Sequence, residues 1–312
     1  MRAVKNTADG IAVVHVPEPD GPGVLVEPAA IGICGSDLHI ASMGPSPVTI
    51  GHEIAGHLDG RAVAIQPFEF CGVCEQCESG RHQTCAVGNR RLQGVHVDGG
   101  MADLVLIDER CIVELPPAVG VADAFLVEPI AVALHAGNLA GLASGMRIAV
   151  VGAGSIGLLQ GAVVRERGLE VDIVARHDAQ RAVAERLGLH PGAVGRYDVV
   201  FDAAGTERSL VEAVDLVAPG GTVVAPAIYW DPVRLPGLAL SLKEATLQPT
   251  AYWGCHEGRR ETDLAAEMLA RTPDLADALI THRFPLDRAP EAFATAADRG
   301  SGAIKVVIEP RA

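Results

Sequence analysis

The amino-acid sequence predicts an α/β protein built from two domains, and three observations carry this prediction. The chain has 312 residues, roughly two domain lengths, so that two separate cores can be buried. The first 115 residues contain short strand-like runs separated by turns, whereas strand-like and helix-like segments alternate after about residue 130. Such alternation, with apolar strands, is typical of a parallel sheet that helices cover on both faces.

Runs rich in valine and isoleucine mark the strands of the first part, and Gly, Pro and Asp residues punctuate them. They predict a small β-barrel-like domain without a long helix. The expected strands are residues 11–16, 24–33, 61–66, 101–107 and 111–115.

The second part is predicted to hold a parallel, doubly wound sheet. Its expected strands are 147–151, 171–175, 197–203 and 221–225, and its expected helices are 130–142, 157–167, 179–187, 209–217 and 261–271. A tail with a helix at 290–298 and a strand at 303–308 is expected to return to the first domain. The predicted domain boundaries are therefore 1–132, 133–272 and 273–312.

Composition and charge exclude several kinds of partner. The chain carries 25 Lys and Arg against 39 Asp and Glu, and its net charge of −14 argues against nucleic acid, which needs a basic face. No apolar run of 18 residues occurs, and the first ten residues lack the apolar core of a signal peptide. We therefore expect no membrane partner and a cytoplasmic location.

Four of the seven cysteines, Cys71, Cys74, Cys77 and Cys85, lie within 15 residues. In a cytoplasmic protein such a cluster binds metal more often than it forms disulfides. The C-x-x-C spacing lets two sulfurs reach one ion from a tight turn, and four thiolates close the tetrahedral shell of a structural zinc. The alternative, four cysteines without metal or joined in disulfides, does not account for three cysteines at intervals of three.

Three short fragments offer the ligands of a second metal site. They are Cys34-Gly-Ser-Asp-Leu-His39, Gly-His52-Glu53 and Val-Glu128-Pro. Each one alone is ordinarily explained by packing or by a hydrogen bond. Together they supply a thiolate, an imidazole and a carboxylate, with a fourth position open for water or a substrate oxygen. That is the arrangement of a catalytic zinc, which lowers the pKa of a bound alcohol.

A glycine-rich turn predicts a dinucleotide site. Gly152, Gly154 and Gly157, with Ser155 and Ile156 between them, follow an expected strand and open an expected helix. In this context the first glycine permits the tight turn, the second lets the backbone approach a pyrophosphate, and the third lets the helix pack on the strand. The helix N-terminus then stabilises the phosphate charge.

The end of the following strand distinguishes the two nicotinamide cofactors. Arg176 stands where NAD enzymes place Asp or Glu, and a guanidinium binds the 2′-phosphate of NADP that a carboxylate would repel. The sequence therefore favours NADP over NAD, with His177 and Arg181 as further contributors. Ala204, at the end of a later strand, is expected near the nicotinamide. The alternative is that Arg176 is only a solvated charge and that both cofactors are used.

These stretches, in this order, resemble the zinc-dependent medium-chain dehydrogenase/reductase family, which includes alcohol, sorbitol and threonine dehydrogenases. The resemblance implies a GroES-like β-barrel catalytic domain, a doubly wound Rossmann domain, and two zinc ions per chain, one catalytic and one structural. It implies that Cys34 and His52 bind the catalytic zinc. Glu53 and Glu128 occupy two acidic positions beside it, of which one ligates while the other holds the zinc-bound water. The sequence does not decide between them.

The same resemblance implies a proton path and adds Glu53 to the catalytic residues. Ser36 matches the hydroxyl that passes on the substrate proton, and His39 matches the outer base, since an imidazole exchanges protons with solvent near pH 7. Asp37 is expected to orient a metal-bound imidazole.

The implied activity is hydride transfer between an alcohol- or polyol-type hydroxyl, or the corresponding carbonyl, and a nicotinamide cofactor, in a homodimer or homotetramer. Two alternatives stay open. One is a dehydrogenase of an amino-polyol, a sugar or threonine, and the other is a non-catalytic NAD(P)-binding sensor on the same scaffold. The intact set of Cys34, His52, Glu53 and Glu128 argues against a sensor, which has no need of an open metal site.

Overall fold

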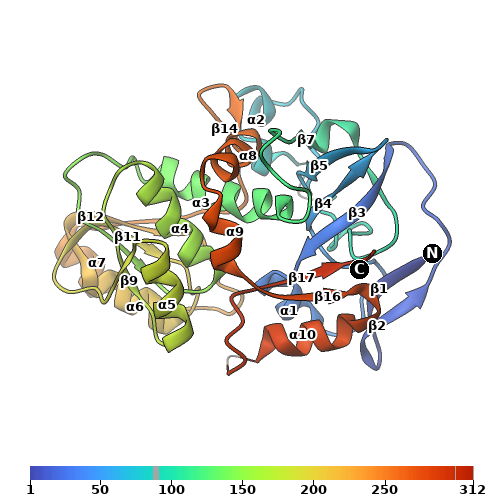
Figure 1. The fold of residues 1–312 in the computed structure, drawn as a ribbon. Helices are drawn as coiled ribbons and strands as arrows, with labels where there is room; N and C mark the ends of the chain where they lie inside the picture. The colour runs from blue at the N-terminus through green and yellow to red at the C-terminus, as the bar shows by residue number, and fades with distance from the viewer. Residues whose placement is uncertain (87–90, 299, 312) are drawn as a thin grey trace. The chain divides into compact units, whose positions relative to one another are not determined.

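The computed structural model describes residues 1–86, 91–298 and 300–311. The chain forms two compact units, one from Met1–Glu128 with Glu257–Ala312 and one from Pro129–His256. Figure 1 shows the elements of both units. The first unit contains a sheet in which antiparallel pairs predominate, and the second contains a parallel sheet flanked by helices, so that the predicted fold class is confirmed.

A seven-stranded sheet forms the centre of the first unit, in the order β16-β17-β3-β4-β5-β7, with β6 paired to β3. A separate hairpin holds β1 and β2. The strands are β1 (Arg2–Thr7), β2 (Gly10–His15), β3 (Val24–Gly32), β4 (Glu53–Leu58), β5 (Arg61–Ile65), β6 (Val105–Ile107), β7 (Ile112–Glu114), β16 (Ile280–Pro285) and β17 (Lys305–Glu309), with the short β15 (Arg259–Arg260). The strand expected over 101–107 is therefore shorter, and β1, β4 and β16 were not among the predicted elements.

The helices of the first unit are mostly short. They are α1 (Gly35–Ser42), α2 (Glu75–Glu78), α8 (Glu261–Arg271), α9 (Asp274–Leu279) and α10 (Ala289–Ala297), with 3₁₀ turns η1 (His82–Thr84), η3 (Glu109–Cys111), η4 (Ala124–Leu126) and η5 (Leu286–Arg288). The predicted boundary at 272 assigned α8 to the second domain. In the structure α8 packs against β7 and η4 of the first unit.

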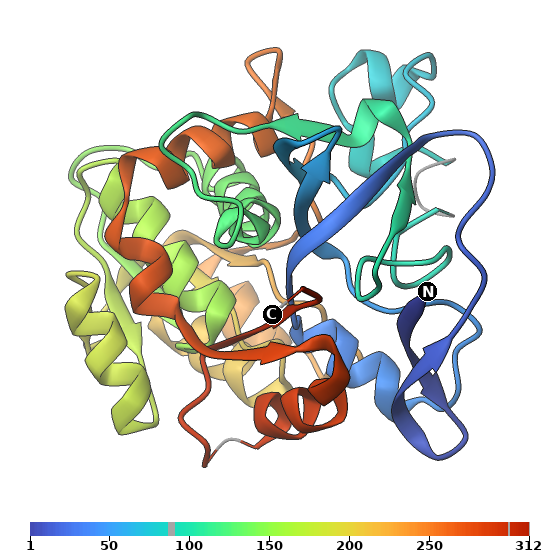
Figure 2. The same ribbon diagram turned by 45° about the vertical axis from the view of Figure 1, so that its right-hand side comes forward.

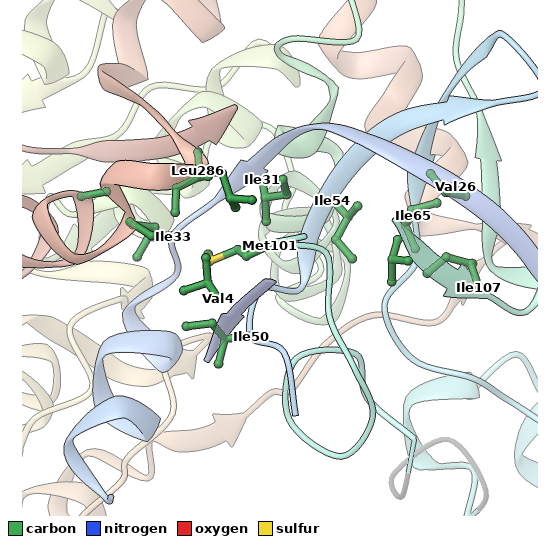
Figure 3. Packing of buried hydrophobic residues seen from close by; sticks show 14 of the residues in the cluster. Val4, Val26, Ile31, Ile33, Ile50, Ile54, Ile65, Met101, Ile107 and Leu286 are labelled. Carbon is green, nitrogen blue, oxygen red and sulfur yellow. The ribbon is translucent and has the colours of Figure 1, made fainter. Parts of the chain in front are cut away.

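The core of the first unit gathers side chains from distant parts of the chain. Figure 3 shows Met101 among Val4, Ile31, Ile50 and Ile54, all of them at most 3% exposed. The C-terminal segment contributes as well, because β17 pairs antiparallel with β3 and α10 covers β16 and β17 (Figures 1 and 2). Residues beyond 280 thus complete the sheet that begins near residue 24.

The second unit is a doubly wound sheet with the strand order β10-β9-β8-β11-β12-β13, all parallel, which is the order of dinucleotide-binding folds. Helices α4 and α5 lie on one face and α6 and α7 on the other (Figure 1). The elements are α3 (Val127–Leu139), β8 (Ile148–Val151), α4 (Ser155–Glu166), β9 (Asp172–Val174), α5 (Asp178–Arg186), β10 (His190–Pro191), β11 (Tyr197–Asp202), α6 (Glu207–Leu216), β12 (Val217–Ala225), α7 (Gly237–Lys243), β13 (Thr246–Pro249) and β14 (Cys255–His256). The predicted strands and helices had not included β10, α7 or β13.

The glycines between β8 and α4 differ in what surrounds them. A Cβ atom on Gly157 would lie 1.8 Å from the carbonyl oxygen of Gly152, whereas a Cβ atom on Gly154 would meet no atom within 4 Å. The close approach of helix α4 to the strand before it therefore requires glycine at 157 and not at 154.

This difference predicts the stability of two alanine variants. Gly157→Ala should lower the free energy of unfolding by about 1–3 kcal/mol or more, because the backbone around the turn has to move. Gly154→Ala, the matched control, should stay within about 0.5 kcal/mol of the parent protein. Thermal unfolding followed by circular dichroism measures both, and equal losses in the two variants would contradict the packing argument.

Candidate functional site

The four clustered cysteines converge in the first unit, as the spacing predicts. Cys74 precedes α2, Cys77 lies within it, and Cys85 follows η1. Their sulfur atoms lie 3.5 Å (Cys74 to Cys77), 3.9 Å (Cys71 to Cys77) and 4.0 Å (Cys74 to Cys85) apart. Four sulfurs at about 2.3 Å from a tetrahedral zinc would stand about 3.8 Å from one another. The separations therefore fit one zinc ion, and no disulfide joins any of the seven cysteines.

The thiol chemistry of the cluster supports the same conclusion. Burial raises the pKa of the Cys77 thiol to about 12, whereas a hydrogen bond from the backbone of Val73 lowers the pKa of Cys71. A buried thiolate at 77 thus needs a cation beside it, and a divalent ion shared by four sulfurs supplies one.

A second cluster forms where β3 and β4 meet. Gly32 at the end of β3 pairs with Glu53 at the start of β4. Cys34 lies just after the end of β3 and His52 lies just before the start of β4, so that the two residues stand at neighbouring strand ends. One ligand atom from each of Cys34, His52 and Glu53 lies within 4.8 Å of the other two. Sulfur, nitrogen and oxygen donors at this spacing are those of a catalytic zinc with an open position.

Asp37 connects two members of this cluster. Its Oδ2 accepts a hydrogen bond from the backbone N–H of Cys34 at 2.9 Å, and its Oδ1 lies 3.1 Å from His52 Nδ1. The second contact is within ion-pair distance. With Nδ1 facing Asp37, the Nε2 atom of His52 is the one directed toward a ligand, 3.3 Å from Ser36 Oγ.

The environment of His52 favours positive charge. Burial lowers the pKa of His52, but the Asp37 carboxylate and then Cys34 outweigh that effect and hold the pKa well above its usual value. The anionic groups that would stabilise a protonated imidazole here are equally suited to stabilise a metal cation.

Ser36 and His39 stand three residues apart on α1 and therefore on the same side of the helix. Both side chains are partly buried. Ser36 thus lies next to His52, and His39 follows about one helical turn further along α1.

Glu128 lies at the start of α3, only 6% exposed, and is outside the group formed by Cys34, His52 and Glu53 among the described residues. Burial raises its pKa to about 8; His52 opposes this rise and Glu53 adds to it. Glu128 therefore binds a proton more readily than an exposed glutamate, unless a cation lies near.

Lys305 is a residue that the sequence analysis missed. Its Nζ donates to both oxygens of Glu53, at 2.7 and 2.8 Å, and both side chains are at most 2% exposed. Burial lowers the pKa of Lys305, but Glu53 and then Cys34 outweigh burial, so that the pKa is raised. The only signal in the sequence was one charged residue inside the apolar segment 303–308.

The glycine turn of the second unit fits a dinucleotide phosphate. Gly154 caps α4, a helix of 12 residues whose first N–H groups point out of the turn. Ser155 Oγ is buried and has no hydrogen-bond partner among the described residues, and Ile156 beside it is partly buried. A hydroxyl without a partner at a helix N-terminus is well placed to donate a hydrogen bond to a phosphate oxygen.

The residues expected to determine cofactor specificity differ in how far their side chains are exposed to a bound cofactor. Arg176 follows β9, is 46% exposed, and lies 3.5 Å from Glu212 of α6. Arg181, expected to assist, donates to the carbonyl oxygens of Ala175 and Arg176 and contacts Asp178. His177 is exposed before α5. The guanidinium of Arg181 thus supports the turn that carries Arg176.

Ala204 follows β11, and its backbone N–H donates to Asp202 Oδ1 at 3.1 Å. The other oxygen of Asp202 accepts from the hydroxyl of Tyr229 at 2.7 Å. Asp202 is fully buried, so that these bonds hold the end of the strand in place.

Comparison with known proteins agrees with this geometry. Residues 20–117 match the alcohol dehydrogenase GroES-like domain, and residues 121–310 match the glucose dehydrogenase C-terminus. The chain belongs to the zinc-type medium-chain dehydrogenase/reductase family. It is 30% identical to the L-galactonate-5-dehydrogenase of Escherichia coli (strain K12) over 89% of each chain. It is also 30% identical to the L-threonine 3-dehydrogenase of Saccharopolyspora erythraea over 99% of each.

A solved structure shares the whole fold of this dehydrogenase. A zinc-binding dehydrogenase of Sinorhizobium meliloti 1021, bound to NADP, superimposes with a TM-score of 0.84 at 29% identity over 99% of both chains. The chain is an oxidoreductase that acts on CH–OH groups with zinc and a nicotinamide cofactor, on a small-molecule substrate, as the motifs predicted. Among the described residues, no helix has the length and apolar character needed to cross a membrane.

The four-cysteine cluster of this dehydrogenase predicts a stability phenotype. Cys74→Ser should lose about one zinc per chain and lower the Tm by roughly 5–10 °C, because metal binding contributes directly to the folding of such loops. Metal analysis and thermal unfolding measure the two effects. Cys255→Ser, which changes a cysteine outside both clusters, serves as the control and should retain the parent zinc content and Tm.

Proposed function

We propose that this dehydrogenase oxidises a polyol-type secondary hydroxyl, or reduces the corresponding ketone, with NADP as the cofactor and with one catalytic and one structural zinc per chain. The observation that carries the proposal is the convergence of Cys34, His52 and Glu53 within 4.8 Å, beside the hydroxyl of Ser36. The four-cysteine cluster supports the second zinc.

The chain's own residues would hold and orient the catalytic group. Cys34 and His52 would bind the metal, and Asp37 would fix both of them, since it contacts the Cys34 N–H and His52 Nδ1. When bound, zinc supplies a Lewis acid that lowers the pKa of a substrate hydroxyl, and the nicotinamide accepts the hydride. The arrangement serves carbonyl reduction equally, because the same groups act in reverse.

Ser36 and His39 would carry the substrate proton. A serine hydroxyl donates and accepts at the same time, so Ser36 can pass a proton on without holding a charge. His39, one helical turn further along α1, can exchange that proton with solvent near neutral pH.

The two acids near the site would have different duties. Glu53 lies with Cys34 and His52 and would serve as the third protein ligand. Glu128, whose burial raises its pKa to about 8, would accept a hydrogen bond from water or substrate or enter as the exchanging ligand.

NADP is proposed on two grounds. Arg176 offers an exposed guanidinium at the end of β9, where an acid would repel a 2′-phosphate. The Sinorhizobium meliloti relative with NADP bound shares the fold over almost the entire chain. Glu212 lies 3.5 Å from Arg176 and competes with the phosphate, so that the preference over NAD is moderate and not absolute.

A polyol-type substrate is proposed because of chemistry common to the relatives' names. L-Galactonate 5-dehydrogenase and L-threonine 3-dehydrogenase both name positions that are secondary alcohols beside another polar group. A sugar, amino-polyol or threonine substrate is the second candidate, carried by the threonine dehydrogenase relative. The intact ligand set supports an enzyme and not a cofactor-binding sensor.

A homodimer is proposed from the surface of the second unit, and two dimers can form a tetramer. Leu238 and Leu242 on α7 are 75% and 77% exposed, and in the described chain β13 pairs only with β12. An open strand edge beside exposed leucines is suited to pairing with a second copy. A cytoplasmic location is proposed from the cysteines, none of which is in a disulfide.

The catalytic zinc is tested by removing one ligand. Cys34→Ser should lose one of the two zinc ions and at least about 1000-fold of the activity, while the Tm changes little, because a catalytic site contributes less to folding than a closed one. Metal analysis and a panel of alcohols, polyols, sugars, threonine and ketones, assayed with both cofactors, measure this. Full activity on any substrate would refute the proposed site, and activity confined to threonine would favour the second candidate.

The cofactor preference is tested at Arg176. Arg176→Asp should raise the KM for NADP about 10- to 100-fold and leave the KM for NAD unchanged or lower, because a carboxylate repels the 2′-phosphate. Arg186→Asp on α5 makes the same change of charge elsewhere in the unit and should leave both values near those of the parent. An unchanged KM for NADP in the Arg176 variant would show that Arg176 is only a solvated charge.

A further inference from the structure

Lys305 and Glu53 form a buried ion pair that joins the N-terminal and C-terminal segments of the first unit. The ammonium donates to both carboxylate oxygens, at 2.7 and 2.8 Å, and lies 3.4 Å from the carbonyl oxygen of Ile33. Both side chains are at most 2% exposed. Burial of a lysine is rare and costly, so its presence here calls for a specific reason.

The strand register explains how the two charges meet. Strand β3 lies between β4 and β17, and its Gly32 pairs with Glu53 on one side and with Val307 on the other. A Cβ atom on Gly32 would lie 1.9 Å from Glu53 Oε2. The carboxylate of Glu53 therefore extends across the bare backbone of Gly32 and reaches Lys305 on the far strand.

The same carboxylate belongs to the candidate metal site. Glu53 offers an oxygen within 4.8 Å of the ligand atoms of Cys34 and His52. Both of its oxygens already accept from an ammonium, and such a carboxylate is a weaker donor to a metal than an unpaired one. Two cations, the lysine and the metal, are thus placed to compete for one anion.

We propose that Lys305 is a positioning residue that competes with the catalytic zinc for the carboxylate of Glu53 and so keeps Glu53 an exchangeable ligand. This inference rests on the proposed function, since it needs a metal at Cys34 and His52. The ion pair provides Glu53 with a stable position away from the metal, while Glu128 is a second buried acid near the same site.

The alternative is that the pair only fastens β17 to the sheet. The two roles predict opposite effects on the metal. A fastening role means that loss of Lys305 loosens the site and releases zinc faster. A competing role means that loss of Lys305 leaves Glu53 to the metal alone, so that zinc is held longer and turnover becomes slower.

The experiment uses zinc-loaded Lys305→Met, in which an uncharged, unbranched side chain one heavy atom shorter replaces the lysine. Zinc transfer to a chromogenic chelator should be roughly tenfold slower than in the parent protein, the size of change typical for residues that contact a metal ligand. The cobalt-substituted protein should show an altered d–d absorption spectrum, because its ligand set changes. The kcat should fall with a smaller change in KM.

Two further variants identify the route of the effect. In a Glu53→Gln background, Lys305→Met should no longer slow zinc release, because the carboxylate over which the cations compete is gone. Lys5→Met removes a partly exposed lysine of the same unit and should behave as the parent. If Lys305→Met does not fold, Lys305→Gln, which still donates a hydrogen bond to Glu53 without the charge, is measured in its place.

The outcomes separate this inference from the proposed function. Faster zinc release and an unchanged cobalt spectrum in the Lys305 variant would overturn the competing role, as would a slowing that persists in the Glu53→Gln background. The site that releases its zinc is identified with Cys34→Ser, which should lack that ion. If Cys34→Ser retains both zinc ions, the proposed catalytic site itself fails, whatever the Lys305 variant does.

Discussion

The position of strand β3 between β4 and β17 is the constraint on which the catalytic unit depends. Neighbouring strands stand about 4.8 Å apart, so the residues paired with Gly32 are brought within side-chain reach of one another. Cys34 lies two residues beyond the end of this strand, His52 directly precedes the next strand, which Glu53 begins, and Lys305 begins the strand on the other side. A shift of either register by one residue would turn these side chains to the opposite face.

Charge is the second organising principle of the site. Half-buried Cys34 and the buried acids Asp37, Glu53 and Glu128 supply four potential anions, and among the described residues buried Lys305 and His52 stand against them as potential cations. Burial penalises such an imbalance strongly. A divalent ion relieves it, which is a physical reason for the metal that is independent of any family resemblance. Neighbouring anions hold the pKa of His52 above its usual value, and burial raises the pKa of Glu128.

The two cysteine-containing sites differ in how the chain brings their residues together. The four-cysteine cluster lies within one loop of 15 residues, and its short sulfur separations come from local turns around α2. The site at Cys34 gathers residues from segments that lie far apart in the chain. Four thiolates would close the coordination shell of a structural zinc, whereas the three donors of Cys34, His52 and Glu53 would leave a position open for chemistry.

The sequence by itself determined the fold class, the four-cysteine loop and the glycine turn, because each depends on local spacing or on the alternation of strands and helices. It also named Cys34, Ser36, His39, His52, Glu53 and Glu128, since these stand in short fragments of distinctive chemistry. It assigned α8 to the other unit, because hydrophobic period does not reveal which surface a helix packs against. Only the tertiary structure showed that Asp37 also accepts from the backbone N–H of Cys34, that Glu212 opposes Arg176, and that Lys305 holds Glu53 across 252 residues of chain. These contacts arise from strand register and helix packing, which no local pattern of residues encodes.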